Sequence, residues 1–194
     1  MKKYIILPLV IFTLLISSCS EDYQLQKSVF VEDVNNPELP IYSEWGYNTF
    51  GVYIDRQPFI SNSSDLPAKI IVNKDTFNLV LKGTMNNRDV TMKFSIIGYS
   101  PADYTDLISL NDSTFNLTSN KCIVTMTTDT IKKLNIFEGK LFFKRAQSLY
   151  VDKEYMESIL SGTFSFKTFI NGEPIAVSNG RFDFGIGYEN FYNY

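Results

Sequence analysis

The chain has 194 residues with a formal net charge of −3, and 44% of its residues are hydrophobic. This length suits one domain with a substantial core, and the acidic balance disfavours nucleic acid, which selects basic surfaces. The chain has no histidine, which removes the commonest general base and metal ligand and every Ser–His or Cys–His nucleophile. We therefore expect no enzymatic activity, no metal and no cofactor.

The first 19 residues have the pattern of a bacterial lipoprotein signal. A charged start precedes an apolar run that ends at Ile16, and this run is shorter than the roughly 20 residues that a spanning helix needs. Ser18 and Cys19 then resemble the lipoprotein cleavage box, in which the cysteine carries the lipid. We expect residues 1–18 to be removed and Cys19 to anchor the protein in the membrane. The alternative is an ordinary secretory signal with a chance cysteine.

The segment after the cysteine is predominantly polar, which predicts a lipidated N-terminus and flexible tether over residues 19–44. Within it, Ser28 to Glu32 is compatible with a short strand. Cleavage would remove Lys2 and Lys3 and change the net charge from −3 to −5, so attachment would depend on the lipid and not on a basic patch.

Short alternating runs bounded by Gly, Asn, Asp and Pro begin at Trp45. They predict a single all-β domain over residues 45–187, an antiparallel β-sandwich or partly closed β-barrel. The clearest feature is a hairpin around Asn86–Asn87. One face of its two strands is apolar and is expected to point inward: Phe77, Leu79, Leu81, Val90, Met92, Phe94 and Ile96.

Further strands are predicted nearer the C-terminus. Asn171–Gly172 has the composition of a tight hairpin turn, and Asn179–Gly180 is either a second turn or a bulge. The strands expected around these turns are Cys122–Thr127, Lys140–Lys144, Gly162–Ile170, Ile175–Ser178 and Arg181–Ile186.

At most one short helix is expected. Asp152 is a candidate cap for a helix that would place Tyr155, Met156, Ile159 and Leu160 on one side. Three acidic residues of this segment can be read as a catalytic carboxylate pair or as the solvated side of the helix, and we favour the second interpretation: Asp152, Glu154 and Glu157.

Three motifs recur in the order seen in a family of Bacteroidota lipoproteins of unknown function, which the chain resembles over residues 45–187. They are Asn48–Phe59 with its Thr-Phe-Gly, Leu160–Phe166 with its Ser-Gly-Thr-Phe, and Asn179–Asp183 with its Gly-Arg-Phe-Asp. In the opening turn the chain departs from the usual Asp-Gly or Asn-Gly by having Asp55–Arg56. The resemblance implies a lipid-anchored outer-membrane protein but assigns no catalytic or ligand residues.

The same resemblance bears on export and modification. Glu21 and Asp22, close behind Cys19, are similar to the signal that sends such lipoproteins to the cell surface. Two Asp-Ser/Thr-X triplets resemble the O-glycosylation signal of exported Bacteroidota proteins, with Ser113 and Thr130 as acceptors.

Other residues have a functional and a structural interpretation. Cys122 is in phase with Val124 and Met126, which favours an inert core residue over a reactive thiol. Four loop residues are oxygen ligands of the kind that calcium uses, but their spacing matches no EF-hand and favours ordinary loop chemistry: Asp103, Asp106, Asn111 and Asp112.

Aromatic residues gather near both ends of the domain. We expect Trp45, Tyr47 and Tyr188 to be buried in the sheet. The aromatic tail over residues 188–194 either lies exposed from Phe191 onward or docks as an extra edge; exposed rings would suit a sugar or a protein partner.

These observations predict a non-enzymatic cell-envelope lipoprotein that binds or scaffolds an unidentified protein or glycan. One alternative is a carboxylate-based glycan hydrolase, which requires two acids about 5–10 Å apart in a cleft. Another is a lipocalin-like carrier, which requires a hollow interior.

Overall fold

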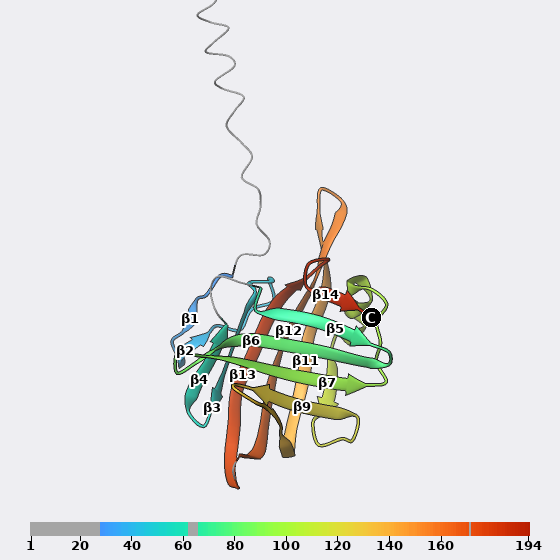
Figure 1. Cartoon of the computed structure of the whole chain (residues 1–194). Helices are drawn as coiled ribbons and strands as arrows, with labels where there is room; N and C mark the ends of the chain where they lie inside the picture. The colour runs from blue at the N-terminus through green and yellow to red at the C-terminus, as the bar shows by residue number, and fades with distance from the viewer. Residues whose placement is uncertain (1–27, 62–65, 171) are drawn as a thin grey trace, which may run out of the picture.

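The computed structural model describes residues 28–61, 66–170 and 172–194 (Figure 1). Almost all of the regular structure is β. The elements are β1 (Glu32–Asp33), β2 (Asn36–Pro40), β3 (Thr49–Ile54), β4 (Gln57–Ser61), β5 (Ala68–Asn73), β6 (Thr76–Met85), β7 (Arg88–Ile97), the 3₁₀-helix η1 (Tyr104–Leu110), β8 (Ser113–Asn116), β9 (Cys122–Thr127), β10 (Ile131–Lys133), β11 (Asn135–Val151), β12 (Glu154–Ile170), β13 (Glu173–Ile186) and β14 (Phe191–Asn193).

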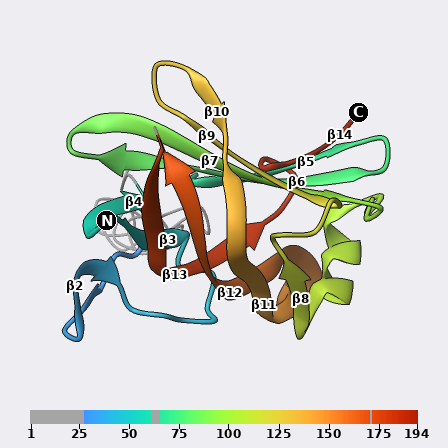
Figure 2. The same ribbon diagram turned by 90° about the horizontal axis from the view of Figure 1, so that it is seen from below.

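A single hydrogen-bonded sheet folds over on itself to make two layers. Its order is β10-β9-β7-β6-β4-β3-β13-β12-β11-β8, with β5 added to β6 and β14 to β5. The front layer holds β5, β6, β7 and β9, and it crosses the back layer of β13, β12 and β11 (Figures 1 and 2). In the described part of the chain, the two edge strands β8 and β10 do not pair with each other, so the sheet stays open. The predicted all-β sandwich is confirmed.

The sheet turns from one layer to the other between β4 and β6, which share only the pairs Ile60–Thr84 and Ser61–Gly83. A side chain has no room at this corner. A Cβ at Gly83 would lie 2.0 Å from the carbonyl oxygen of Ile60 and 2.8 Å from the ring of Phe50. Glycine is therefore required where the two backbones approach.

Aromatic side chains fill the space between the layers. Phe50 and Phe59 meet edge to face at 4.8 Å, and Phe94 meets Phe164 at 5.1 Å, the arrangement that ring quadrupoles favour. The largest fully buried aromatic residues are Phe50, Phe59, Phe77, Phe94, Phe143, Phe182 and Phe184. The core is packed with side chains, as interiors of normal density are.

The hairpin predicted around Asn86–Asn87 is β6–β7. Its register pairs Leu79 with Phe94, with both side chains buried, and both turn residues have positive φ (52° and 60°). The opening turn Asp55–Arg56 also has positive φ at both positions (47° and 70°), so the absence of glycine there does not change the backbone.

The second predicted hairpin is β12–β13. Its turn includes Gly172, with φ of 87°; Asn171 lies outside the described residues. Asn179–Gly180 is a bulge and not a second turn, because the pairing of β13 with β12 and with β3 shifts register there and the strand continues.

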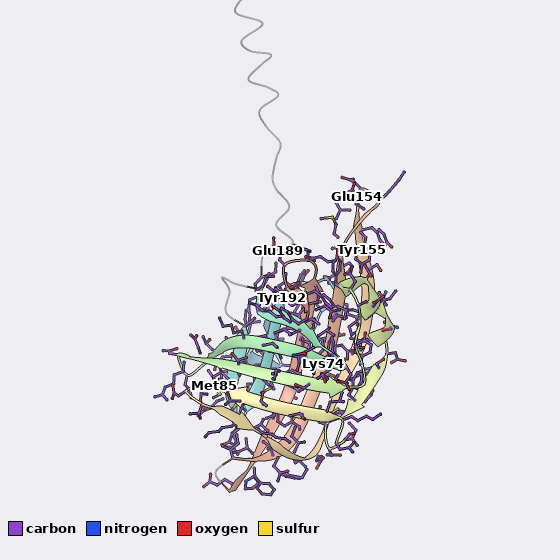
Figure 3. The ribbon with its side chains drawn as sticks, turned by 45° about the vertical axis from the view of Figure 1, so that its right-hand side comes forward. Lys74, Met85, Glu154, Tyr155, Glu189 and Tyr192 are labelled. Atoms are coloured by element: carbon purple, nitrogen blue, oxygen red, sulfur yellow. The ribbon has the colours of Figure 1, made fainter. Side chains whose placement is uncertain are left out.

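The predicted helix after Asp152 is wrong. Asp152–Lys153 forms a tight turn, with φ of 51° and 71°, between two 17-residue strands whose ends project from the body, where Glu154 and Tyr155 lie (Figures 1 and 3). Pairing with β11 gives this segment the backbone hydrogen bonds that an isolated short helix would have to make alone.

The helix is elsewhere, over Tyr104–Leu110, in a region expected to be a loop. Asp103 is its N-cap and forms a capping box with Asp106, which stabilises the exposed N–H groups of the first turn. The side chains of these two acids accept hydrogen bonds from backbone N–H groups at the start of the helix.

The segment before Trp45 is not a free tether over its described part, residues 28–44. It contains β1 and β2, and Leu39 is fully buried. Pro40 packs so closely on β3 that a Cβ added at Gly51 would lie 2.4 Å from the proline ring. The carboxylate of Asp33 pairs with the guanidinium of Arg181 on β13. The described part of this segment therefore covers the outer face of the back layer.

The C-terminal tail docks as an extra edge, one of the two arrangements considered. β14 runs parallel to β5, with Tyr192 opposite Ile71. Phe191 packs against the core, whereas Tyr194 is 77% exposed.

Candidate functional site: a tryptophan loop fixed by a buried aspartate

The site begins with Asp183, whose side chain is 1% exposed. Inward positions of β13 are taken by Phe182 and Phe184, so strand alternation turns Asp183 to the outer face. There the loop over residues 42–47 crosses it. The carboxylate accepts hydrogen bonds from the N–H groups of Trp45 (3.1 Å), Gly46 (2.8 Å) and Tyr47 (3.1 Å), and from the hydroxyl of Ser43.

These bonds fix the backbone of the loop. Three successive N–H groups point at one carboxylate, an arrangement that suits an anion, and Gly46 supplies the positive φ of 77° that the curve needs. A charged acceptor makes each bond stronger than a neutral one. We call residues 42–47 the tryptophan loop.

The consequence is that Trp45 faces solvent, with 74% of its surface exposed. The expectation that it is buried is wrong, because Ser43 and Gly46 take the inward positions of the tryptophan loop. Tyr188 was also expected to be buried and is 87% exposed, whereas Tyr47 is half-buried. The exposed indole is available to contact a ligand or a partner through its apolar face and its N–H group.

Polar side chains of β11 lie beside the ring. Gln147 donates to the carbonyl oxygen of Glu44 (3.0 Å) and accepts from Nε of Arg145 (2.9 Å). Lys144 pairs with Glu44 at 3.3 Å and lies 4.8 Å from the ring centre of Tyr42. Together they make a surface hollow lined by Tyr42, Ser43, Glu44, Trp45, Arg145 and Gln147.

The protonation states of the hollow follow from its contacts. Partial burial acts to raise the pKa of Glu44, but hydrogen bonds from Tyr42 and Lys144 outweigh it and hold that pKa below its usual value. Burial and the hydrogen bond to Glu44 raise the pKa of Tyr42 to about 12. Near neutral pH, Glu44 is therefore charged and Tyr42 remains a donor to it at 3.0 Å.

Glu157, on β12, lies on the same outer face as Asp183 and nearer to the turn of the β11–β12 hairpin. Its side chain rests on two glycines: a Cβ at Gly185 would come within 2.1 Å of its carboxyl oxygen, and one at Gly187 within 3.3 Å of its Cγ. Burial raises the pKa of Glu157 to about 7. Asp152, Glu154 and Glu157, predicted to form the solvated side of a short helix, lie instead on the β11–β12 hairpin, where the first two are exposed near the tip.

The three motifs of the sequence come together beneath the tryptophan loop. In the registers of β13, Asp183 lies opposite Thr49 and Ser161, and Gly162 lies opposite Phe182. The sequence analysis did not identify Asp183 as a functional residue. Two sequence features could have indicated it. Asp183 is an outward aspartate between two inward phenylalanines, and Ser43 to Gly46 has the composition of a turn.

The other predicted site residues lie apart from this hollow. Ser113 is half-buried at the start of edge strand β8, and Thr130 is exposed between β9 and β10. Cys122 packs partly buried against the core opposite Ile96, and burial raises the pKa of its thiol.

The expected cleavage and lipidation site, Ser18 and Cys19, and the expected export signal, Glu21 and Asp22, lie outside the described residues. In the described ranges, no group of three or more acidic or cysteine side chains is placed to hold a metal ion. In those same ranges, no helix is long and apolar enough to cross a membrane.

Comparisons of the chain with protein-family models, with curated proteins and with solved structures gave no match.

Proposed function

We propose that the protein is a non-enzymatic, lipid-anchored module of the cell envelope that binds saccharides at the tryptophan loop. The observation that carries this proposal is the pairing of Asp183 with Trp45, which holds the chain's single tryptophan 74% exposed on a fixed backbone. The apolar face of a sugar ring stacks on an indole, and a preformed platform avoids the entropic cost of ordering a loop on binding.

The polar lining of the hollow supports a saccharide over an apolar ligand. Gln147, Glu44 and Arg145 supply amide, carboxylate and guanidinium groups within one connected network. Such groups match the hydroxyls around a sugar ring. Each of these three groups is already hydrogen-bonded or ion-paired to a neighbouring residue, so the network is preorganised.

The packed interior does not support the lipocalin-like alternative. A carrier needs a cavity between its walls, whereas Phe94, Phe164 and their neighbours fill that space here. The outer face is therefore the better place to look for a ligand.

A glycan hydrolase is the second candidate, favoured by one observation. Glu157 and Glu44 lie on the same outer face with pKa values moved in opposite directions, and a carboxyl group with a raised pKa can serve as a general acid. Binding is preferred because Glu157 is not among the residues that line the hollow. Release of reducing sugar that is abolished by Glu157→Gln would establish the hydrolase.

The location is proposed from the sequence. We place the mature protein in the outer membrane through a lipid on Cys19, with Glu21 and Asp22 directing it to the cell surface. An alkyne fatty acid should label the wild-type protein and not Cys19→Ala, and equal labelling of both would contradict lipidation. Protease treatment of intact cells should cleave the wild type, but not Glu21→Ala/Asp22→Ala if these residues direct export.

The binding proposal is tested on a glycan array with the full-length protein in detergent. The wild type should bind a defined set of glycans, and Trp45→Ala should bind none of them. Tyr194→Ala is the matched control, because Tyr194 is 77% exposed on the front layer, away from the hollow. Equal binding by all three proteins would show that the binding site does not involve Trp45. Absence of binding by the wild type would overturn the proposal.

A further inference from the structure

The guanidinium of Arg145 has donors that the fold leaves available beside Trp45. Its Nε–H is used by Gln147 at 2.9 Å. Neither terminal NH₂ group has a hydrogen-bond partner among the described residues, and Arg145 is exposed at the hollow. The side chain is therefore oriented but still able to bind.

Gln147 sets that orientation. Its amide nitrogen is bound to the carbonyl oxygen of Glu44 at 3.0 Å, so its amide oxygen is fixed toward Arg145. The guanidinium is planar, and holding Nε–H fixes the plane in which the two NH₂ groups lie. In this orientation the two NH₂ groups can donate two parallel hydrogen bonds to one carboxylate.

Two acidic and two basic side chains lie at the hollow or directly beneath it: Glu44, Asp183, Lys144 and Arg145. Lys144 and Glu44 form a pair at 3.3 Å and largely compensate each other. The carboxylate of Asp183 is buried beneath the tryptophan loop and occupied by three N–H groups and a hydroxyl. Arg145 is the one cation among the residues that line the hollow.

We infer that the hollow selects saccharides that contain a hexuronic acid, with Trp45 stacking on the ring and Arg145 binding the ring carboxylate. This inference rests on the proposed saccharide function and names its ligand class. A carboxylate on C5 of a pyranose projects from the edge of the ring, so one sugar can place its apolar face on the indole and its acid on an adjacent guanidinium.

The test uses oligosaccharides of galacturonate, glucuronate, mannuronate and guluronate, each as the free acid and as the methyl ester. Esterification removes the charge and keeps the ring. We expect the wild-type full-length protein to bind at least one acid tenfold or more tightly than its ester, by calorimetry at pH 7. Arg145→Gln should bind acid and ester equally, and Arg145→Lys should lose most of the preference, because an ammonium lacks the planar fork.

Lys167→Gln is the control for simple loss of positive charge, since Lys167 is an exposed lysine paired with Glu138 and is not among the residues that line the hollow; it should keep the full preference. If neutral glycans bind at Trp45 and no acid is preferred over its ester, the inference is overturned and the saccharide function survives. If no glycan of either kind binds, both fail. A preference that persists unchanged in Arg145→Gln would also overturn the inference.

Discussion

The carboxylate of Asp183 accepts a hydrogen bond from the backbone N–H of Trp45 at 3.1 Å, although the two residues are 138 positions apart in the sequence. This contact fixes the backbone at Trp45 and leaves its aromatic side chain as an exposed platform. The carboxylate belongs to a strand in the middle of the sheet, and the indole belongs to the segment that enters the domain. The binding surface is thus fixed by the fold and not by local loop conformation.

Asp183→Asn should destabilise the protein by about 2–4 kcal/mol. The variant retains one acceptor oxygen and places an NH₂ group against buried N–H donors, which leaves polar groups unsatisfied. Ser43→Ala removes one donor and should cost about 1 kcal/mol. Urea unfolding measures both, and the emission anisotropy of Trp45 should fall in Asp183→Asn. A midpoint equal to the wild type would show that Asp183 does not hold the loop.

Glu157 should make stability depend on pH. Its pKa is about 7 in the folded protein, above the ordinary value of 4.5, so its contribution is fully present below about pH 4.5 and is lost as pH rises through 7. Relative to the wild type, Glu157→Gln should gain about 2 kcal/mol between pH 4.5 and 8, a value reduced for the solvent contact of a partly exposed group. A difference that stays constant with pH would contradict the raised pKa.

The pair of Asp33 and Arg181 should fasten the entering segment above pH 4. The N–H of Asn35, the side chain of Asn36 and Arg181 lower the pKa of Asp33 to about 2. Its contribution is therefore present above the unfolded value of 3.8 and is lost as pH falls toward 2. Asp33→Asn should speed hydrogen exchange of the Ile41 amide, which bonds to Val31 at 2.7 Å.

A surface pair provides the control for this effect. Lys167 and Glu138 are both more than half exposed, and such pairs contribute little, so Glu138→Gln should leave exchange of the Ile41 amide unchanged. If Asp33→Asn exchanges as slowly as Glu138→Gln at pH 7, the ion pair does not hold the segment.

Gly83→Ala should test the corner between the layers. Its methyl group would lie 2.0 Å from a carbonyl oxygen, and we expect a loss of roughly 2–3 kcal/mol from forced backbone movement. Gly98→Ala is the comparison, because no atom lies within 4 Å and only its φ of 88° is unfavourable; it should cost about 1 kcal/mol. Equal thermal melting of the two variants would mean that the corner has room to relax.

Much of the fold follows from the sequence alone, and the exceptions have physical causes. Alternation placed Leu79 and Phe94 inward because a strand with one buried face has only one workable register. The helix after Asp152 was predicted wrongly because a short apolar run fits both periods, and only pairing with β11 decides between them. The 3₁₀-helix was missed although Asp103 and Asp106 have capping-box spacing.

The site was harder to predict because its parts are remote in sequence. Trp45 was expected inside on β-propensity, and nothing near it in the chain indicates that Asp183 holds its backbone. Arg145 and Gln147 lie on a third segment, and their contact with Glu44 depends on the loop already being in place. Local patterns identify strands, whereas this hollow arises from tertiary contacts.

The most direct test is the emission of the single tryptophan during titration with the glycan that binds best on the array. Saturable binding should change Trp45 emission in the wild type and in Tyr194→Ala with the same dissociation constant, and calorimetry should detect no binding to Trp45→Ala. The account would be contradicted if Trp45→Ala bound with wild-type affinity, or if saturating glycan left the emission of the wild type unchanged.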